Sequence, residues 1–379
     1  MIRVSQQHGA FFAFCIYAMA LGAIFPRLGD MQVQMGIGEG QLGMSVIGAA
    51  LGVQLSLLVA GRVCRTVGFC WIMGVGIIII SGAEMIASLS LGPLAFFCWL
   101  FVAGLSIGVV EVAVNVEADR TEFQIGRRVM NRCHAFWSFG FFGSGLVGAL
   151  IAQLHISVFA HMAGFMIFTS CSALLLIRFY QPAIPRPGED SQSVTFVRPT
   201  KPILMLVALT LSAMLLEGAG IDWSVIFMRD VFATPPFVSG LALALVALSQ
   251  FIVRFFADDF VERHGPETVT YCSVITLGVG VSLVSFAPTP SAALVGFSLL
   301  GAGTAVIFPL AISAAAQRTD RPPAVNVAAL AQLSFVVFLL APPLLGAVAE
   351  FFGIRVSFGI GLPLVVLSWF MVRYLRPST

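Results

Sequence analysis

The polar stretch YQPAIPRPGEDSQSVTFVRPTKP, residues 180–202, divides an otherwise apolar chain of 379 residues into two parts of similar length. Its proline, serine and charged residues are typical of a flexible linker. Hydrophobic residues make up 59% of the chain and charged residues 10%, whereas a soluble globular protein carries about 25% charged residues. A soluble fold of this length could not bury so much apolar surface, so the sequence predicts an integral membrane protein.

Six apolar segments precede this stretch and six follow it. A membrane-spanning helix needs about 20 mostly apolar residues. Segments of that kind are expected at 10–27, 41–60, 68–89, 93–116, 133–154, 157–179, 203–227, 237–256, 268–287, 291–314, 324–348 and 355–374. The predicted fold is therefore all-α, with twelve transmembrane helices in two six-helix bundles, residues 1–179 and 203–379, joined by a cytoplasmic linker.

The basic residues are distributed unevenly between the loops of the two membrane faces. If the loops alternate between faces, one face holds only Arg27, Arg229 and Arg355. The other face holds seventeen of the twenty Lys and Arg residues: Arg3, Arg62, Arg65, Arg120, Arg127, Arg128, Arg132, Arg178, Arg186, Arg198, Lys201, Arg254, Arg263, Arg318, Arg321, Arg373 and Arg376. Cytoplasmic loops retain basic residues, so both termini are predicted to be cytoplasmic.

The two parts of the chain also resemble each other at a fixed offset. Gly68 and Gly265, each in a loop after a predicted helix, lie 197 positions apart, and so do Gly104 and Gly301 within predicted helices. Parallel six-helix repeats build one large class of transporters, in which the solute binds at the midplane between the repeats.

One loop carries a family motif. The stretch Ala257-Asp-Asp-Phe-Val-Glu-Arg-His-Gly265 resembles the loop signature of the major facilitator superfamily. The resemblance implies that Asp258, Glu262 and Arg263 contribute to an acid–base pairing at the cytoplasmic gate. The first-half copy, residues 61–68, departs from the pattern because Arg65 stands where the acid is expected.

Three further segments are similar to the fucose-permease-like branch of this superfamily and its bacterial relatives. They are EVAVN at 111–115, MNRCHAFWSFG at 130–140 and EGAGIDW at 217–223. Fucose permeases carry a Glu and an Asn at the spacing of the first segment, which implies a sugar-like solute and proton symport. They also carry an acid in the first helix, and residues 10–27 contain none.

Glu111 is the first candidate for proton coupling. Gly104, Gly108, Glu111 and Asn115 follow a spacing that places them on one helix face. An ionised carboxylate at the bilayer centre costs at least ~2.5–3.5 kcal/mol, so this group is expected to face a cavity and to exchange a proton. His134 is a second candidate, since imidazole titrates near neutrality. The alternatives are a structural Glu111 and a His134 that only bonds to acids at the end of the helix at 93–116.

The segment 217–223 offers a third group of candidates. Glu217 is a candidate for proton coupling and for solute binding, together with Asp222 and Trp223, whose ring could stack on a sugar. Unwinding of the helix at Gly218 and Gly220 would let both acids line a cavity. The alternative is that Asp222 and Trp223 mark the membrane interface, where Trp is enriched.

Other polar residues complete the predicted sites. Further solute-binding candidates within predicted helices are Trp137, Tyr17, Gln54, Gln250 and Asn326. An inner gate of exchangeable ion pairs is expected from Arg120, Arg127 and Arg128 with Glu117, Asp119, Glu122 and Arg132. No Arg is expected near the centre of any helix, which favours an uncharged solute.

The sequence thus predicts a secondary transporter that moves a small polyhydroxylated solute by alternating access and proton symport. An exporter of an apolar or cationic compound, with Glu217 and Asp222 as counter-charges, is the alternative within transport. A membrane enzyme using His134 is disfavoured by the lack of metal, nucleophile-elbow or phosphate-loop motifs; a solute sensor remains open. No cofactor or metal is predicted. The expected partners are the solute, protons and the lipid bilayer, without nucleic acid, and the expected state is a monomer.

Overall fold

The computed structural model describes residues 5–127, 129–185 and 198–376. This part of the chain contains twelve helical segments long and apolar enough to cross a membrane, and no strand. The predicted all-α fold with twelve spans is confirmed. Nine spans are continuous helices: α3 (Glu39–Val67), α4 (Phe69–Ala87), α5 (Pro93–Ile125), α6 (Met130–Gln153), α7 (Val158–Phe179), α8 (Lys201–Asp222), α10 (Pro236–His264), α11 (Pro266–Phe286) and α14 (Pro323–Phe352).

The other spans are interrupted. The first consists of α1 (Gln6–Gly22), η1 (Phe25–Arg27) and α2 (Leu28–Met35), and the last of α15 (Ile354–Gly359), α16 (Gly361–Met371) and η3 (Val372–Leu375). A separate short helix, α9 (Ser224–Phe232), follows the seventh span. The tenth breaks between α12 (Pro290–Thr304) and α13 (Ile307–Ala316). Each break frees backbone carbonyl and amide groups for other partners.

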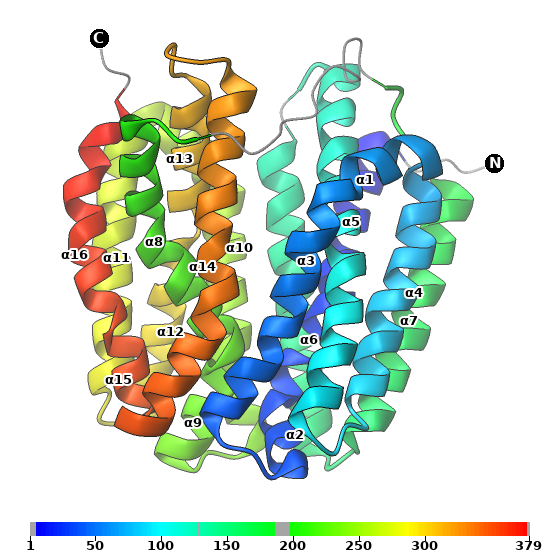
Figure 1. Cartoon of the computed structure of the whole chain (residues 1–379), viewed down its shortest axis with the longest axis vertical. Helices are drawn as coiled ribbons and strands as arrows, with labels where there is room; N and C mark the ends of the chain where they lie inside the picture. Colours follow the sequence, from blue (N-terminus) through cyan, green and yellow to red (C-terminus); the bar gives the residue numbers. More distant parts are fainter. Residues whose placement is uncertain (1–4, 128, 186–197, 377–379) are drawn as a thin grey trace.

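The twelve spans bring the first and last helical residues, Gln6 and Leu375, to the same side of the molecule (Figure 1). We call this side the terminal face and the opposite side, where α2 and α9 lie, the far face. Helices α1–α7 gather in one bundle and α8–α16 in the other (Figure 1). A buried hydrophobic cluster confined to residues 10–180 gives the first bundle a core of its own. The division at 180–202 stays a prediction, and residues 186–197 of the linker lie outside the described residues.

The bundles meet along two helix pairs, α3 with α14 and α6 with α10. Gly43 of α3 lies so close to the backbone of Pro342 in α14 that a side chain would not fit. Gly240 of α10 lies equally close to Ala149 of α6. In Figure 1, α3 and α14 lie together at the far face and diverge toward the terminal face. The far face is therefore the closed side of this conformation.

The predicted internal repeat is visible in the backbone. Gly68 has φ 83° and ψ 151°, and Gly265, 197 residues later, has φ 79° and ψ 154°. Both residues end a long helix and begin the next one, in a region of backbone space open almost only to glycine.

Close packing follows the same offset. A side chain on Gly104 would overlap the carbonyl oxygen of Ala49, and one on Gly301 would overlap that of Val246. Ala49 and Val246 are themselves 197 residues apart. The spans that carry these residues therefore pack in the same way in both halves.

Two predictions about helix continuity are wrong. The chain does not unwind at Gly218 and Gly220; α8 runs through both and ends at Asp222. A glycine within a helix costs only about 1 kcal/mol, and Gly220 packs closely against Leu300 and Val246. The eighth span also extends to His264 in place of 256, so Arg254 lies well inside the helix and not close to its end.

Candidate functional site

Glu111 and Asn115 lie one turn apart on α5, as their spacing predicts. The Asn115 side-chain amide donates to Glu111 Oε1 at 2.9 Å and to the Glu111 backbone carbonyl at 2.8 Å. The hydroxyl of Tyr17, a buried residue of α1, donates to the same carboxylate. Two donors therefore hold the Glu111 side chain between α1 and α5.

His134 continues this contact onto α6. Its Nε2 atom lies 3.2 Å from Asn115 Oδ1. Because the Asn115 amide nitrogen already donates to Glu111, its oxygen is the acceptor here, so His134 must carry a proton on Nε2. The imidazole packs edge-on against Phe14, with ring centroids 5.2 Å apart. The neighbouring residues therefore fix both the orientation and the tautomer of His134.

Ser138, one turn after His134, extends the contact to the second half of the chain. Its hydroxyl donates to the His134 backbone carbonyl at 3.2 Å and accepts from Arg254 Nη1 at 2.8 Å. Ser138 is fully buried. This single side chain links α6 of the first half to α10 of the second.

Arg254 is the centre of the second-half site. Its Nη2 donates to Glu217 Oε1 of α8 at 3.2 Å, and its Nε donates to the Ala305 carbonyl at 3.1 Å. Ala305 follows the last residue of α12, so its carbonyl is freed by the break in the tenth span. The negative end of a helix favours a cation at this position. The Arg254 and Glu217 side chains are 14% and 12% exposed.

These contacts form one connected arrangement, which we call the polar chain: Glu111, Asn115, His134, Ser138, Arg254 and Glu217. It runs from the interior of the first half across the interface to the second. The carboxyl group of Glu111 and the ion pair of Arg254 with Glu217 offer donors and acceptors within a low-dielectric region, where hydrogen bonds are strong.

The position of Arg254 overturns the prediction that no Arg lies near a helix centre. Because Arg254 lies near the end of the helix expected at 237–256, the sequence groups it with the basic residues of one membrane face. In the structure the side chain turns inward to three partners. The apolar residues on both sides of it, from Phe251 to Phe256, were the available signal. Ser138 was likewise missed, since a lone Ser in a spanning helix is usually a local packing residue.

The remaining solute-binding candidates are spread over several parts of the molecule. Gln250, one turn before Arg254, donates to Thr304 Oγ1 at 3.1 Å and so fixes the same helix break. Gln54 of α3 donates across the interface to the Phe335 carbonyl of α14 at 3.4 Å.

Trp137 stacks on Phe141, with ring centroids 5.2 Å apart. Asp222, the last residue of α8, is half-buried. Trp223 is 2% exposed and its ring packs against Gly346 of α14. In this conformation the Trp223 indole offers no open face for stacking on a sugar, nor does it lie at an exposed membrane interface.

Asn326 belongs to the terminal face, away from the polar chain. Its amide donates to Asp320 Oδ1 at 2.9 Å, and this hydrogen bond lowers the pKa of the Asp320 carboxyl below its ordinary value. The contact ties the loop before α14 to the first turn of that helix, so the geometry is that of a structural amide.

Among the predicted gating residues that the structure describes, Asp258 contacts the other half of the chain. Its carboxylate accepts a hydrogen bond from the Asn131 amide of α6 at the terminal face. Glu262, Arg263 and Arg127 are exposed, and Arg120 is half-buried. Arg128 lies outside the described residues.

Two acids of the predicted inner gate are structural instead. Glu117 is 1% exposed, and its Oε1 accepts from the Tyr180 hydroxyl and the Ala183 amide, both at 2.6 Å. Burial and the adjacent Glu117 carboxylate raise the pKa of Tyr180 well above its ordinary value, which keeps the phenol a donor. Glu122 Oε1 accepts from the backbone amides of Val129 and Met130, at the start of α6. Side chains held this way are not freely exchangeable gate charges.

No group of three or more His, Cys, Asp or Glu residues suited to a metal occurs among the described residues.

Comparisons with known proteins agree on one family. The Major Facilitator Superfamily model matches residues 205–379. An uncharacterised MFS-type transporter of Yersinia pestis is 25% identical over 94% of this chain and 92% of its own length. An uncharacterised transporter of Sinorhizobium fredii is 27% identical over 92% of each chain.

Solved structures share the fold at low sequence identity. A D-xylose-proton symporter superposes with a TM-score of 0.75 at 13% identity, covering 98% of both chains. A point mutant of the nucleoside transporter NupG gives 0.77 at 13% identity, covering 98% of this chain and 100% of its own. A point mutant of the E. coli fucose:proton symporter FucP gives 0.64 at 15% identity over 98% of both chains.

Proposed function

Since this chain belongs to the Major Facilitator Superfamily, we propose that it is a proton-coupled symporter of a small, neutral, polyhydroxylated solute that works by alternating access. The observation that carries this proposal is the polar chain. It joins an intramembrane carboxyl of the first half to an ion pair of the second through four hydrogen bonds, of which the one between Arg254 and Ser138 crosses between the halves. A solute bound between the halves would meet both ends.

Glu111 is assigned the transported proton. When ionised it accepts from Tyr17 and Asn115; when protonated it can donate, so its local hydrogen bonds must rearrange. A change in Asn115 passes to His134 through the Oδ1 contact. Protonation of Glu111 therefore affects the interface through these hydrogen bonds. This coupling does not require the proton itself to move along a long path.

The proposal that the solute is neutral is based on the balance of charges at Arg254 and Glu217. Arg254 is an intramembrane cation, but Glu217 compensates it at 3.2 Å. Displacing Glu217 with an anionic solute would leave a carboxylate without its partner in a region where an unpaired charge is costly. Hydroxyl groups can instead donate to Glu217 and accept from Arg254 without breaking the pair. The xylose and nucleoside transporters that share this fold act on hydroxylated solutes.

The exporter alternative is weakened by the same pair. Glu217 already has a cationic partner, which leaves Asp222 as the remaining counter-charge for a cationic compound. An apolar compound would also find few apolar side chains along the polar chain itself.

Orientation and assembly are part of the proposal. We propose that the terminal face lies in the cytoplasm of a bacterium, with the inner membrane as the location of the protein, because basic residues such as Arg62, Arg263 and Arg373 belong to that face. Because each bundle buries its polar side chains against the other, we propose a monomer as the working unit.

The test is solute-driven proton movement in liposomes. Purified protein is reconstituted with a pH dye inside, and pentoses, hexoses and nucleosides are added outside. Symport predicts internal acidification with one class of solute and loss of this signal in Glu111→Gln, while solute counterflow persists. A symport signal that survives in Glu111→Gln would contradict the assignment.

Glu84 supplies the matched control. It is a second intramembrane carboxyl, 2% exposed, on α4 and outside the polar chain. Glu84→Gln is expected to keep solute-driven acidification. An equal loss in both variants would show that removing any buried carboxyl impairs the protein, and would remove the reason to single out Glu111.

A further inference from the structure

We propose that the far face is held shut by a latch in which each half of the chain caps a helix of the other, around a central arginine. The latch consists of Arg229 with Gly29 and Gln32, Glu350 with Gly40, and Gln153 with Phe237. This inference rests on the alternating-access function proposed above, because only a face that opens needs a releasable closure.

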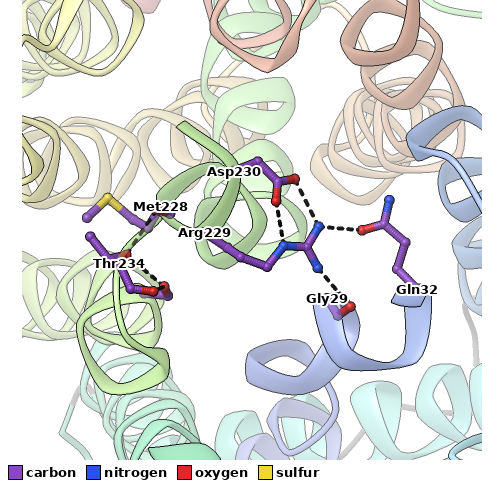
Figure 2. A network of polar contacts seen from close by, with 7 residues as sticks. Gly29, Gln32, Met228, Arg229, Asp230 and Thr234 are labelled. Atoms are coloured by element: carbon purple, nitrogen blue, oxygen red, sulfur yellow. Dashed lines mark hydrogen bonds and ion pairs between the residues drawn. The ribbon is translucent and has the colours of Figure 1, made fainter. Parts of the chain in front are cut away.

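Arg229 makes the central contact (Figure 2). From α9 it reaches α2 of the first half, where Nη1 donates to the Gly29 carbonyl and Nη2 to Gln32 Oε1, both at 2.8 Å. Asp230 accepts from Nε at 2.5 Å and from Nη2 at 2.9 Å. The carboxylate orients the guanidinium and balances its charge, so the remaining donors point to α2.

Gly29 has a specific role in this contact. A side chain at this position would lie 2.8 Å from Arg229 Nη1 and would displace the guanidinium. The glycine therefore allows the arginine to reach the backbone of the opposite half.

Glu350 makes the first cross-half cap. It lies at the end of α14, and its Oε2 accepts from the backbone amide of Gly40 at 2.8 Å. Gly40 is in the first turn of α3, whose own cap residue, Gly38, has no side chain to satisfy the free amides. A carboxylate at a helix N-terminus is also favoured by the helix dipole.

Gln153 makes the second cap in the reverse direction. It ends α6, and its Oε1 accepts from the backbone amide of Phe237 at 3.2 Å. Phe237 is in the first turn of α10, and the two preceding residues are Pro235 and Pro236. Neither proline has an amide hydrogen, so Phe237 is the first available donor of that helix.

Three pairs of these residues follow the internal repeat. Gln153 and Glu350 are 197 residues apart, and so are Gly40 and Phe237. Gln32 and Arg229, which bond to each other, have the same separation. Equivalent residues of two repeats meet only near the axis that relates the repeats. Arg229 therefore lies close to that axis, and the two caps flank it as a pair.

The caps differ in one respect that matters for the gate. The second half offers a carboxylate, whereas the first offers a neutral amide. The Arg229 and Asp230 side chains are 32% and 35% exposed and Glu350 is exposed, so water can replace these bonds when the face opens. A latch of solvent-accessible hydrogen bonds is strong enough to bias the closed state and weak enough to release.

The experiment measures opening directly. Spin labels are placed at Leu91 and Phe286, which are exposed on the far-face ends of the two halves, after the seven cysteines are replaced. Distance distributions are recorded in lipid without solute. Arg229→Ala is expected to raise the ratio of the long-distance to the short-distance population about tenfold, and Glu350→Ala about threefold. Gln153→Glu is expected to lower the ratio, because it creates a second carboxylate cap.

Arg355→Ala is the matched control. Arg355 is also an arginine of the far face, but it donates to Ser285 and lies over the Phe227 ring, within the second half alone. This variant is expected to leave the distances unchanged. Unchanged distances in Arg229→Ala combined with Glu350→Ala, or an equal shift in Arg355→Ala, would overturn the latch. Since no solute is present, a shift in the absence of any transport would keep the latch and count against the proposed function alone.

Discussion

The far-face latch and the polar chain are built from the same two repeats in opposite ways. In the latch, Gln153 and Glu350 are repeat partners with the same task. In the polar chain, the position 197 residues after Glu111 is Phe308, and the position 197 residues before Arg254 is Leu57. Neither partner can repeat the chemistry.

This difference separates the residues that shape the fold, which follow the repeat, from the residues of the polar chain, which do not. We call the first group framework positions. Closure requires two halves that match each other, so the repeat is retained in glycines, helix ends and caps. The proposed proton symport requires a titratable carboxyl group linked to an ion pair, and at these positions the repeat is broken. Substitutions at framework positions should therefore act in pairs, and substitutions in the polar chain should act alone.

The largest expected effect tests the symmetry of packing. Gly104→Ala and Gly301→Ala each place a methyl group against a backbone carbonyl, of Ala49 and Val246 respectively. We expect both to destabilise the protein by about 3 kcal/mol or more, the upper range for overpacking. Thermal unfolding in detergent would measure this. A large loss in one variant and none in the other would break the structural equivalence of the halves.

Arg254→Ala tests the polar chain, which does not follow the repeat. It leaves Glu217 without its cationic partner, and loss of one member of a buried pair costs about 3 kcal/mol. The side chains are 14% and 12% exposed, so little of this is relieved by water. Unfolding temperatures of Arg254→Ala, Glu217→Gln and the double variant form a cycle. We expect the double variant to be more stable than Arg254→Ala; additive losses would argue against the pair.

The helix-ending glycines give a smaller, paired effect. Gly68→Ala and Gly265→Ala force alanine into nearly the same unfavourable backbone geometry, at about 1–3 kcal/mol each. Gly36→Ala is the control, because its repeat partner Ala233 already has positive φ, 50° against 64°. We expect Gly36→Ala to cost less than either. An equal cost for all three in urea or thermal unfolding would contradict the geometric argument.

The smallest effect concerns His134. Its Nε2 donates to Asn115, and the amide of His134→Gln can replace that donor. We expect proton-coupled uptake to stay within about tenfold of the wild type, whereas loss of a required proton carrier costs about 10²-fold or more. Flux measurements at several pH values would distinguish the two. A collapse of coupling in His134→Gln would make His134 itself the proton carrier.

Local sequence patterns predicted the features that are determined by a short stretch of the chain. Apolar length set the twelve spans, and the 197-residue offset indicated the repeat that Gly68 and Gly265 display. The four-residue spacing of Glu111 and Asn115 on one helix was enough to place them together. The resemblance to the superfamily identified the family and pointed to His134.

Other features were decided by the packing of distant segments. Glu117 and Glu122 looked like exchangeable charges until Tyr180 and the start of α6 were folded against them. Arg254 lies in a sequence that fits either a loop or a helix. Its inward direction depends on Glu217 and on the carbonyl freed at Ala305, which come from two other helices.

The sequence by itself therefore determined the membrane location, the number of spans and the carboxyl–amide pair, because hydrophobic length and helical spacing act within one segment. Only the tertiary structure decided that Arg254 completes the polar chain and that Arg229, Glu350 and Gln153 close the far face. Those contacts join residues up to 310 positions apart, and a hydrogen bond between two halves exists only once both halves have packed.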